Sequence, residues 1–289
     1  MPSTFYTSVS DIALCQKCPA LLAYKLHKGE KLAWSVGIKG SGFPYGSLFH
    51  KNISQVFFEG ASDRNSGLHS EIAESLKGSA ESLEAVVRRN IFMPFIASHC
   101  EEFTSGQIFA LARGVTVWVR AMWDFFSGIP SLMRSPEINM HTVFIPPEQK
   151  LRARFKLPDG SGLVVNGCYD ALMFNPDKAE ARLFEFKGYM KTDIAVPLSQ
   201  SLIYSWLIYR HTGIVPSVEI IYLDEYGKEP DIFAPGAVTE MIKAGLPGLF
   251  SSVFTVMAMK KLPEFVRSSK LCSCCKFRLK CEDDWGKMI

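Results

Sequence analysis

The part of the chain that most constrains its fold is residues 163–204, which read LVVNGCYDALMFNPDKAEARLFEFKGYMKTDIAVPLSQSLIY. An apolar run rich in strand-forming residues leads to Asp170. Asn175-Pro176-Asp177 then supplies the residue types that end a strand and start a turn. The chain returns as a second strand-like run over 181–186. The pattern predicts a β-hairpin with Asp170 on one strand.

The returning strand carries a charged face. Glu185 and Lys187 alternate with Phe184 and Phe186. Residues two apart in a strand share a face, so the two charged side chains point one way and the two phenylalanines point the other way, into a core. Pairing of the hairpin strands is expected to bring Asp170 beside Glu185. Two carboxylates and an ammonium group on one face form a site for a hard cation.

The chemistry of such a site favours phosphodiester hydrolysis. Mg²⁺ and Mn²⁺ prefer oxygen ligands, commonly one or two carboxylates, and leave positions for water and phosphate oxygens. A bound metal lowers the pKa of water, and a neighbouring Lys orients the nucleophile or stabilises the transition state. A surface hairpin with a solvated ion pair gives the same short pattern, so the interpretation needs support from elsewhere in the chain.

Two further polar motifs give that support. Gly46 and His50 form a G-x-x-x-H pattern on a predicted early helix, and His50 is a candidate metal ligand. Gln200 and Tyr204 share one face of a helix predicted over about 197–210. Both could hydrogen-bond Lys187 or a DNA phosphate. The ordinary alternatives are a structural histidine and two polar residues on an amphipathic helix.

The chain has eight cysteines, four of them within 272–281. In a chain without a secretion signal, this number favours metal or cluster binding over disulfides. Four thiolates suit a [4Fe–4S] cluster or a Zn²⁺ ion that joins the two chain ends. The tail supplies three candidate ligands in a C-x-x-C-x5-C pattern, and the N-terminal region supplies the fourth: Cys18, Cys272, Cys275 and Cys281. Cys15 could replace Cys18, and Cys274 could replace a ligand of the tail. A zinc site or free thiols are the alternatives.

Composition sets broad bounds. The 289 residues are 47% hydrophobic, which fits a globular enzyme with a buried core. A formal net charge of +3 permits an acidic partner such as nucleic acid without requiring one. No apolar stretch looks long and uncharged enough to span a membrane, and residues 1–20 lack a signal-peptide pattern. We therefore expect a cytoplasmic protein with no membrane partner.

Other elements follow from local patterns. Residues 4–27 predict a strand and then a helix, capped by Ser8 or Ser10 with Asp11. Residues 60–139 have helical spacing and predict a helical insertion, with Trp118, Trp123, Phe125 and Phe126 in its core. A turn over 157–162 predicts a hairpin. Strands are expected over 141–156 and 217–224, a loop over 225–236, and a helix over 238–260 broken near 245–248.

The order of these motifs resembles the RecB-like branch of the PD-(D/E)XK nuclease superfamily. Six motifs occur in the order found in that branch: Cys-Pro, G-x-x-x-H, D, E-x-K, Q-x-x-x-Y and C-x-x-C-x5-C. More narrowly, the chain is similar to the members with a C-terminal iron–sulfur cysteine triplet, namely the CRISPR-adaptation nuclease family, with the AddB-type repair nucleases as relatives. Each motif alone is loose, but all six in order are specific. Residues 60–139 are not matched.

The resemblance implies a fold and roles for the named residues. The fold is an α/β, restriction-endonuclease-like core, a mixed sheet flanked by helices, in a single nuclease domain over 1–289. Residues 60–139 would be an insertion, and residues 262–289 with Cys18 an iron–sulfur clamp. Lys187 would position the attacking water, and Gln200 and Tyr204 would orient Lys187 or the DNA. Mn²⁺ or Mg²⁺ would be held by four groups: His50, Asp170, Glu185 and the backbone carbonyl of Phe186.

The implied function is a metal-dependent DNA exonuclease, a hydrolase of single-stranded DNA ends with endonuclease activity in some members. It would process prespacers during CRISPR spacer acquisition, an antiviral defence, with the CRISPR integrase complex as a partner. One alternative is a DNA-repair or recombination nuclease of the AddB type. Another is a non-catalytic nucleic-acid-binding assembly subunit.

Overall fold

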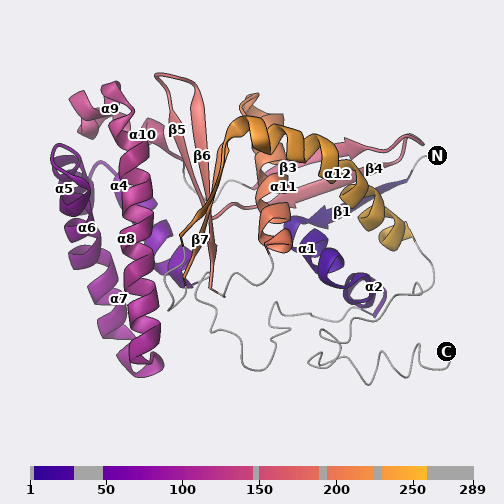
Figure 1. The fold of residues 1–289 in the computed structure, drawn as a ribbon, viewed down its shortest axis with the longest axis horizontal. Helices are drawn as coiled ribbons and strands as arrows, with labels where there is room; N and C mark the ends of the chain where they lie inside the picture. Colours follow the sequence, from indigo (N-terminus) through magenta and orange to yellow (C-terminus); the bar gives the residue numbers. More distant parts are fainter. Residues whose placement is uncertain (1–2, 29–47, 146–149, 189–193, 224–228, 259–289) are drawn as a thin grey trace. The chain divides into compact units, whose positions relative to one another are not determined.

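The computed structural model describes residues 3–28, 48–145, 150–188, 194–223 and 229–258 (Figure 1). Internal contacts divide the chain into two units. The first comprises residues 1–43, 152–166 and 244–289, and the second comprises residues 44–151 and 167–243. Each unit contains a sheet with helices packed on it, so the mixed α/β class is confirmed.

The first unit contains a three-stranded sheet in the order β1-β4-β3. Its strands are β1 (Thr4–Ser8), β3 (Leu151–Lys156) and β4 (Gly162–Gly167). β4 is central and pairs in parallel with β1, with Phe5 opposite Leu163. The predicted turn joins β3 to β4, where the Leu157 N–H donates to the Ser161 carbonyl at 3.0 Å. Gly160 has a φ of +82°, which suits a residue without a Cβ.

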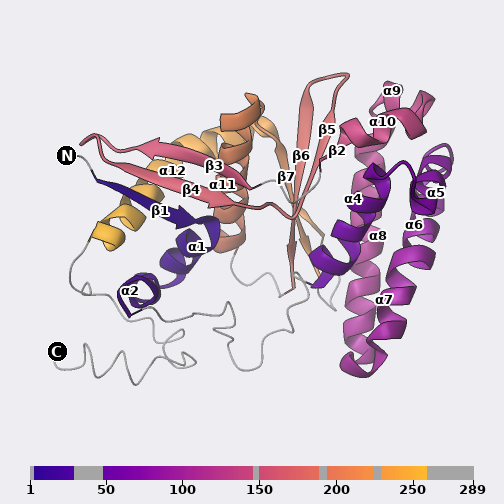
Figure 2. The same cartoon turned by 180° about the vertical axis from the view of Figure 1, so that it is seen from behind.

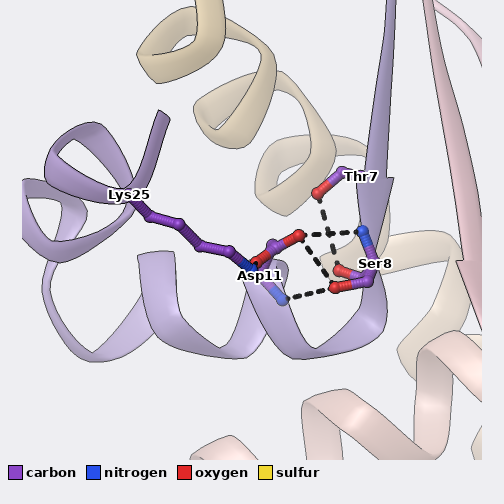
Figure 3. Close-up of polar contacts among 4 residues, drawn as sticks. All are labelled: Thr7, Ser8, Asp11 and Lys25. Atoms are coloured by element: carbon purple, nitrogen blue, oxygen red, sulfur yellow. Dashed lines mark hydrogen bonds and ion pairs between the residues drawn. The ribbon is translucent and has the colours of Figure 1, made fainter. Parts of the chain in front are cut away.

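Two helices follow β1, namely α1 (Val9–Lys17) and α2 (Pro19–Lys28). Ser8 caps α1. Its hydroxyl accepts from the Asp11 N–H at 3.1 Å, and an Asp11 oxygen accepts from the Ser8 N–H at 3.3 Å (Figure 3). Lys25 of α2 forms an ion pair with Asp11. The strand, the helix and one of the two predicted caps are therefore confirmed, and the ion pair ties α2 to the start of α1.

The second unit contains a five-stranded mixed sheet in the order β2-β5-β6-β7-β8. The strands are β2 (Phe144–Ile145), β5 (Ala171–Asn175), β6 (Glu180–Lys187), β7 (Ser217–Tyr222) and β8 (Asp231–Phe233). β5 and β6 form the predicted hairpin, and β6 and β7 run in parallel. The helix α11 (Ala195–Thr212) forms the crossover between these two parallel strands.

The region over 60–139 is helical, as predicted, and it contains no strand. Its longest helix is α8 (Ser105–Ser127). The second unit has these further helical segments before β2, within the described residues: η1 (His50–Ser54), α4 (Gln55–Ser62), α5 (Gly67–Ser75), α6 (Ala80–Val87), η2 (Arg88–Phe92), α7 (Met93–Ser98), η3 (Cys100–Glu102), α9 (Pro130–Arg134) and α10 (Pro136–Val143). Trp118, Phe125 and Phe126 are buried and Trp123 is half-buried, so most of the predicted aromatic core is confirmed.

The sheet of the second unit lies between two helical layers. On one face, Phe186 of β6 contacts Trp118 of α8, with ring centroids 6.0 Å apart. On the other face, Lys187 contacts Gln200 of α11. The alternation predicted for β6 is therefore present, and the aromatic residues point into the core on the α8 side.

Several predicted boundaries were wrong. The run over 163–169 does not continue into the strand that pairs with β6. β4 ends at Gly167 in the sheet of the first unit, and β5 begins at Ala171 in the second sheet. Residues 141–143 end a helix, α10, because Met140 and Val143 are buried at helical spacing. Part of the predicted loop over 225–236 forms β8, where the Tyr222 hydroxyl donates to an Asp231 oxygen at 2.7 Å.

The last described helix, α12 (Pro235–Ala258), is continuous through Pro247, and the predicted break is absent from it. Leu246, Phe250 and Val253 are buried at spacings of four and three residues, and this packing outweighs the hydrogen bond that Pro247 removes. By length and composition α12 is also apolar enough to cross a membrane, contrary to the expectation from sequence, with 22% of its most apolar window buried. Core helices of ordinary domains satisfy the same criteria.

Candidate active site

The two predicted carboxylates lie side by side in the second unit. Asp170 immediately precedes β5, and Glu185 lies near the end of β6. The register pairs Ala171 with Phe184, so the next residues outward are Asp170 and Glu185. The Phe186 N–H donates to Asp170 Oδ2 at 3.0 Å and fixes this carboxylate against β6. The predicted juxtaposition of Asp170 and Glu185 is confirmed.

Lys187 completes the charged face. Its Nζ forms an ion pair with Glu185 Oε1 and donates to Gln200 Oε1 at 2.9 Å. The Lys187 side chain is only 12% exposed. Gln200 is buried on the first half of α11, directly over the sheet. The predicted hydrogen bond between Gln200 and Lys187 is therefore present, and it holds the ammonium group in one position.

Burial sets the charge of the two carboxyl groups. It raises the pKa of Glu185 to about 7, with a further increase from the Asp170 carboxylate that the Lys187 ammonium partly offsets. Burial also raises the pKa of Asp170, against the opposing effects of Lys187 and the Phe186 N–H. The two carboxyl groups thus share the Lys187 ammonium, and His50 also favours ionisation of Glu185. A second cation here favours ionisation of both groups.

His50 reaches this site from the helical layer on the α8 side. It begins η1, and the preceding Phe49 packs on Phe186 with ring centroids 4.8 Å apart. Burial lowers the pKa of His50, whereas the Glu185 carboxylate and the backbone of Asp170 favour the protonated ring. A neutral imidazole is the form that binds a metal.

Two atoms of the predicted metal ligands are buried without a hydrogen-bond partner in the described part of the chain, namely His50 Nδ1 and Glu185 Oε2. A buried polar atom without a partner costs roughly 1–3 kcal/mol unless a ligand or water satisfies it. A nitrogen donor and carboxylate oxygens match the donor types that Mn²⁺ accepts. The donor types present therefore suit a divalent cation, although no group of three or more His, Cys, Asp or Glu side chains among the described residues is arranged to hold a metal ion in this structure.

Tyr204 lies near the two carboxylates but does not take part in the hydrogen bond that Gln200 forms with Lys187. It is 8% exposed on α11. Burial raises its pKa, and the charges of Glu185, Asp170 and Cys168 raise it further. No hydrogen bond between Tyr204 and Lys187 occurs within the described residues. A role for Tyr204 in orienting DNA stays a prediction, as does a metal-binding role for the Phe186 carbonyl.

No functional role was predicted for Cys168 and Tyr169, which lie between the end of β4 and Asp170. Tyr169 is buried, and Cys168 is exposed and close enough to influence Tyr204. Their only signal in the sequence is their position directly before Asp170.

Of the predicted cluster ligands, only Cys18 lies within the described residues. Cys272, Cys275 and Cys281 lie outside them, as does Cys274. Cys18 ends α1 in an extended conformation before Pro19, as expected for a residue that precedes proline. Cys18 is half-buried, whereas Cys15 is buried. Burial and the neighbouring Cys18 raise the pKa of Cys15 to about 11, which disfavours the thiolate that a metal requires.

Comparisons with known proteins add little to this geometry. No family model and no curated protein matches the sequence. Among solved structures, the chain is similar to the protein in "Crystal structure of SSO0001", with 12% sequence identity and a TM-score of 0.34. That similarity covers 82% of this chain and 98% of the other. It is too low to establish a shared fold.

Proposed function

We propose that this protein is a metal-dependent DNA nuclease of the RecB-like PD-(D/E)XK type. The observation that carries the proposal is the arrangement of Asp170, Glu185 and Lys187 on one end of a mixed sheet, with His50 beside them. The four predicted residues come from three separate parts of the sequence and lie close together in the second unit. The buried atoms His50 Nδ1 and Glu185 Oε2 have no hydrogen-bond partner among the described residues. A bound cation would satisfy both atoms, whereas a structural ion pair between Glu185 and Lys187 alone would not.

Each residue has a role that follows from its surroundings. His50, Asp170 and Glu185 would hold Mn²⁺ or Mg²⁺, together with the Phe186 carbonyl. When bound, the metal supplies charge stabilisation and activates water. Lys187 would orient that water towards the phosphodiester, and Gln200 fixes the ammonium group through the hydrogen bond at 2.9 Å. The scissile P–O bond breaks as the water oxygen bonds to phosphorus, which leaves a 5′-phosphate on one product.

The proposed cofactor at the chain ends is a [4Fe–4S] cluster on Cys18, Cys272, Cys275 and Cys281. Hydrolysis transfers no electrons, so the proposed role of the cluster is structural. The burial of Cys15 supports Cys18 as the N-terminal ligand, because only Cys18 is partly accessible.

The proposed substrate is single-stranded DNA ends, cut as an exonuclease during prespacer processing beside the CRISPR integrase. This pathway rests on the motif resemblance alone. Repair of the AddB type uses the same chemistry and stays the alternative. A non-catalytic assembly subunit is less well supported, since such a subunit has no need of the Gln200–Lys187–Glu185 contacts.

The proposal is tested by cleavage of end-labelled single-stranded DNA with Mn²⁺, using full-length protein purified without oxygen. Lys187→Ala is expected to reduce the rate by about a hundredfold or more, because it removes one preorganised group that stabilises the transition state. Lys178→Ala removes an exposed lysine from the turn between β5 and β6 and serves as the matched control. Equal rates for wild type and Lys187→Ala would show that the proposed site does not cut DNA.

A further inference from the structure

The sheet of the first unit has one face covered by α12 and another that faces outward. Phe5 of β1 and Phe155 of β3 contact α12 through Phe254 and Phe250, with ring centroids 5.2 Å and 4.9 Å apart. Figure 2 shows β1, β4 and β3 with α12 behind them. Because neighbours along a strand point to opposite faces, Tyr6 and the even-numbered residues of β3 lie on the face away from α12.

That outward face is positively charged. β3 reads LRARFK, and its three basic residues alternate with Ala153 and Phe155. Arg152, Arg154 and Lys156 are all exposed. The sequences of β1, β3 and β4 contain no Asp or Glu. Three cations in a row on one strand, with no carboxylate on the neighbouring strands, favour an extended polyanion as the ligand.

The two arginines lie flat across the sheet. The guanidinium carbon of Arg152 is 5.0 Å from the centroid of the Tyr6 ring on β1. Arg154 Nη2 donates to Thr4 Oγ1 at 3.3 Å. Both side chains cross β4 to do so. Gly162 of β4 provides the space, since a Cβ there would lie 2.6 Å from Arg154 Nε.

Tyr6 adds an aromatic surface to the charges. Its side chain is 61% exposed, an unusual state for a large ring in the middle of a strand. Aromatic rings and guanidinium planes are the surfaces on which unpaired bases stack. The combination of a basic row and an exposed ring is typical of sheets that bind single-stranded nucleic acid.

We infer that the face of β1, β4 and β3 formed by Tyr6, Arg152, Arg154 and Lys156 binds a single strand of DNA. The phosphates would lie along the basic row of β3, and a base would stack on the Tyr6–Arg152 pair. The inference deepens the proposed function and rests on it for the choice of DNA, because a nuclease must hold the strand that it cuts. An anionic lipid surface or an acidic protein would use the charges but would not require Tyr6.

Binding is measured apart from cleavage, in full-length protein that carries Lys187→Ala. The probe is a fluorescent oligothymidylate of about 20 nucleotides, and the readout is anisotropy over a range of salt concentrations. The test variant combines Arg152→Gln, Arg154→Gln and Lys156→Gln. The matched control removes three exposed charges elsewhere, through Lys77→Gln, Arg134→Gln and Lys243→Gln. Circular dichroism and thermal melting confirm that both variants are folded.

The test variant is expected to bind about tenfold or more weakly than the control, with a salt dependence reduced by about 2 in the log–log slope. Tyr6→Ala is expected to weaken binding by roughly five- to hundredfold, and Tyr6→Phe, which keeps the ring, is expected to bind like wild type. A variant that keeps the three positive charges, with Arg152→Lys, Arg154→Lys and Lys156→Arg, should retain most of the wild-type affinity.

Equal affinities of the test and control variants for the oligonucleotide would overturn the inference. Loss of binding to phosphatidylglycerol vesicles, with DNA binding unchanged, would also overturn it and assign the face to a membrane. The experiments distinguish failure of this DNA-binding inference from failure of the proposed nuclease function. Wild-type protein that cleaves DNA while the test variant binds it normally contradicts only this inference. Binding through this face without any cleavage by wild type contradicts only the proposed nuclease.

Discussion

At the scale of single residues, the sheet of the second unit carries a buried glutamate on each face. Besides Glu185, Glu219 of β7 is 2% exposed, and it lies on the opposite face of the sheet. Its partner is Arg182, whose Nη1 is 3.5 Å from Glu219 Oε2 and donates to the Ala121 carbonyl of α8 at 3.1 Å. The guanidinium carbon also lies 5.3 Å from the centroid of the Phe125 ring. Glu219 therefore belongs to the packing of α8 on the sheet and not to the candidate active site.

Burial raises the pKa of Glu219 from 4.5 to about 7, an effect that Arg182 partly offsets and Asp124 reinforces. Between these two values the folded protein binds more protons than the unfolded chain, so its free energy of unfolding falls as the pH rises. Wild type should lose free energy of unfolding at about 1.4 kcal/mol per pH unit in this range. Between pH 5 and pH 8 its loss should exceed that of the Glu219→Gln variant by about 3 kcal/mol. Denaturant unfolding at the two pH values measures this.

Glu240→Gln, which removes an exposed carboxylate from α12, is the control for Glu219→Gln. It should leave the pH dependence unchanged. If Glu219→Gln and wild type lose the same stability between the two pH values, Glu219 is ionised in the folded protein at low pH and the account of its burial is wrong.

At the scale of elements, α8 positions the site through a close contact with the segment that carries His50. Gly114 of α8 faces Phe49 and Leu223, and an added Cβ would lie 2.2 Å from Leu223 Cδ2 and 3.2 Å from Phe49 Cε2. Both neighbours are buried, so neither side chain can move without repacking the core. The glycine allows α8 to approach the residue next to His50.

Gly114→Ala should therefore reduce the free energy of unfolding by about 1–3 kcal/mol, although alanine is the better helix former. Gly245→Ala on α12 is the matched control, because within the described residues its added Cβ meets no atom within 4 Å beyond its own stretch of helix. That change should stabilise by up to about 1 kcal/mol. Chemical denaturation of the two variants gives the comparison, and a Gly114→Ala protein more stable than wild type would contradict the packing described for α8.

Element-level patterns also explain which parts of the fold were predictable. The alternation around Glu185 and Lys187 and the turn after Asn175 depend on local chemistry, and both are confirmed. The assignment of the 163–167 run to a different sheet from Asp170 was not predictable, because strand pairing depends on distant residues such as Phe5. The R-A-R-F-K alternation of β3 was visible in the sequence, but its meaning depends on which face α12 covers.

At the scale of the whole molecule, the proposed iron–sulfur clamp connects the N-terminal region with the cysteine-rich tail. The Cys-Pro context favours Cys18 over Cys15 as the N-terminal ligand, but spacing alone leaves Cys15 as an alternative. Packing separates them, because Cys15 is on the buried face of α1 and Cys18 is at its end. The other three proposed ligands still depend on spacing alone.

Protein purified without oxygen should show the broad visible absorption of a [4Fe–4S] cluster, and Cys18→Ala should lose it together with bound iron. Cys15→Ala is the matched control and should keep both, with a small loss of stability from the space left in the core. Iron analysis and visible spectra of the two variants test the choice. A colourless wild type that contains zinc would replace the cluster by a zinc site, and a brown Cys18→Ala protein would exclude Cys18 as a ligand.

The measurement that tests the central claim most directly is the metal dependence of DNA cleavage. Wild-type protein treated with a chelator should not cut end-labelled single-stranded DNA until Mn²⁺ or Mg²⁺ is added. Asp170→Asn should stay inactive at every metal concentration, whereas Asp177→Asn, in the turn beyond β5, should behave like wild type. Cleavage by wild type without a divalent metal, or by Asp170→Asn at the wild-type rate, would contradict the proposed active site.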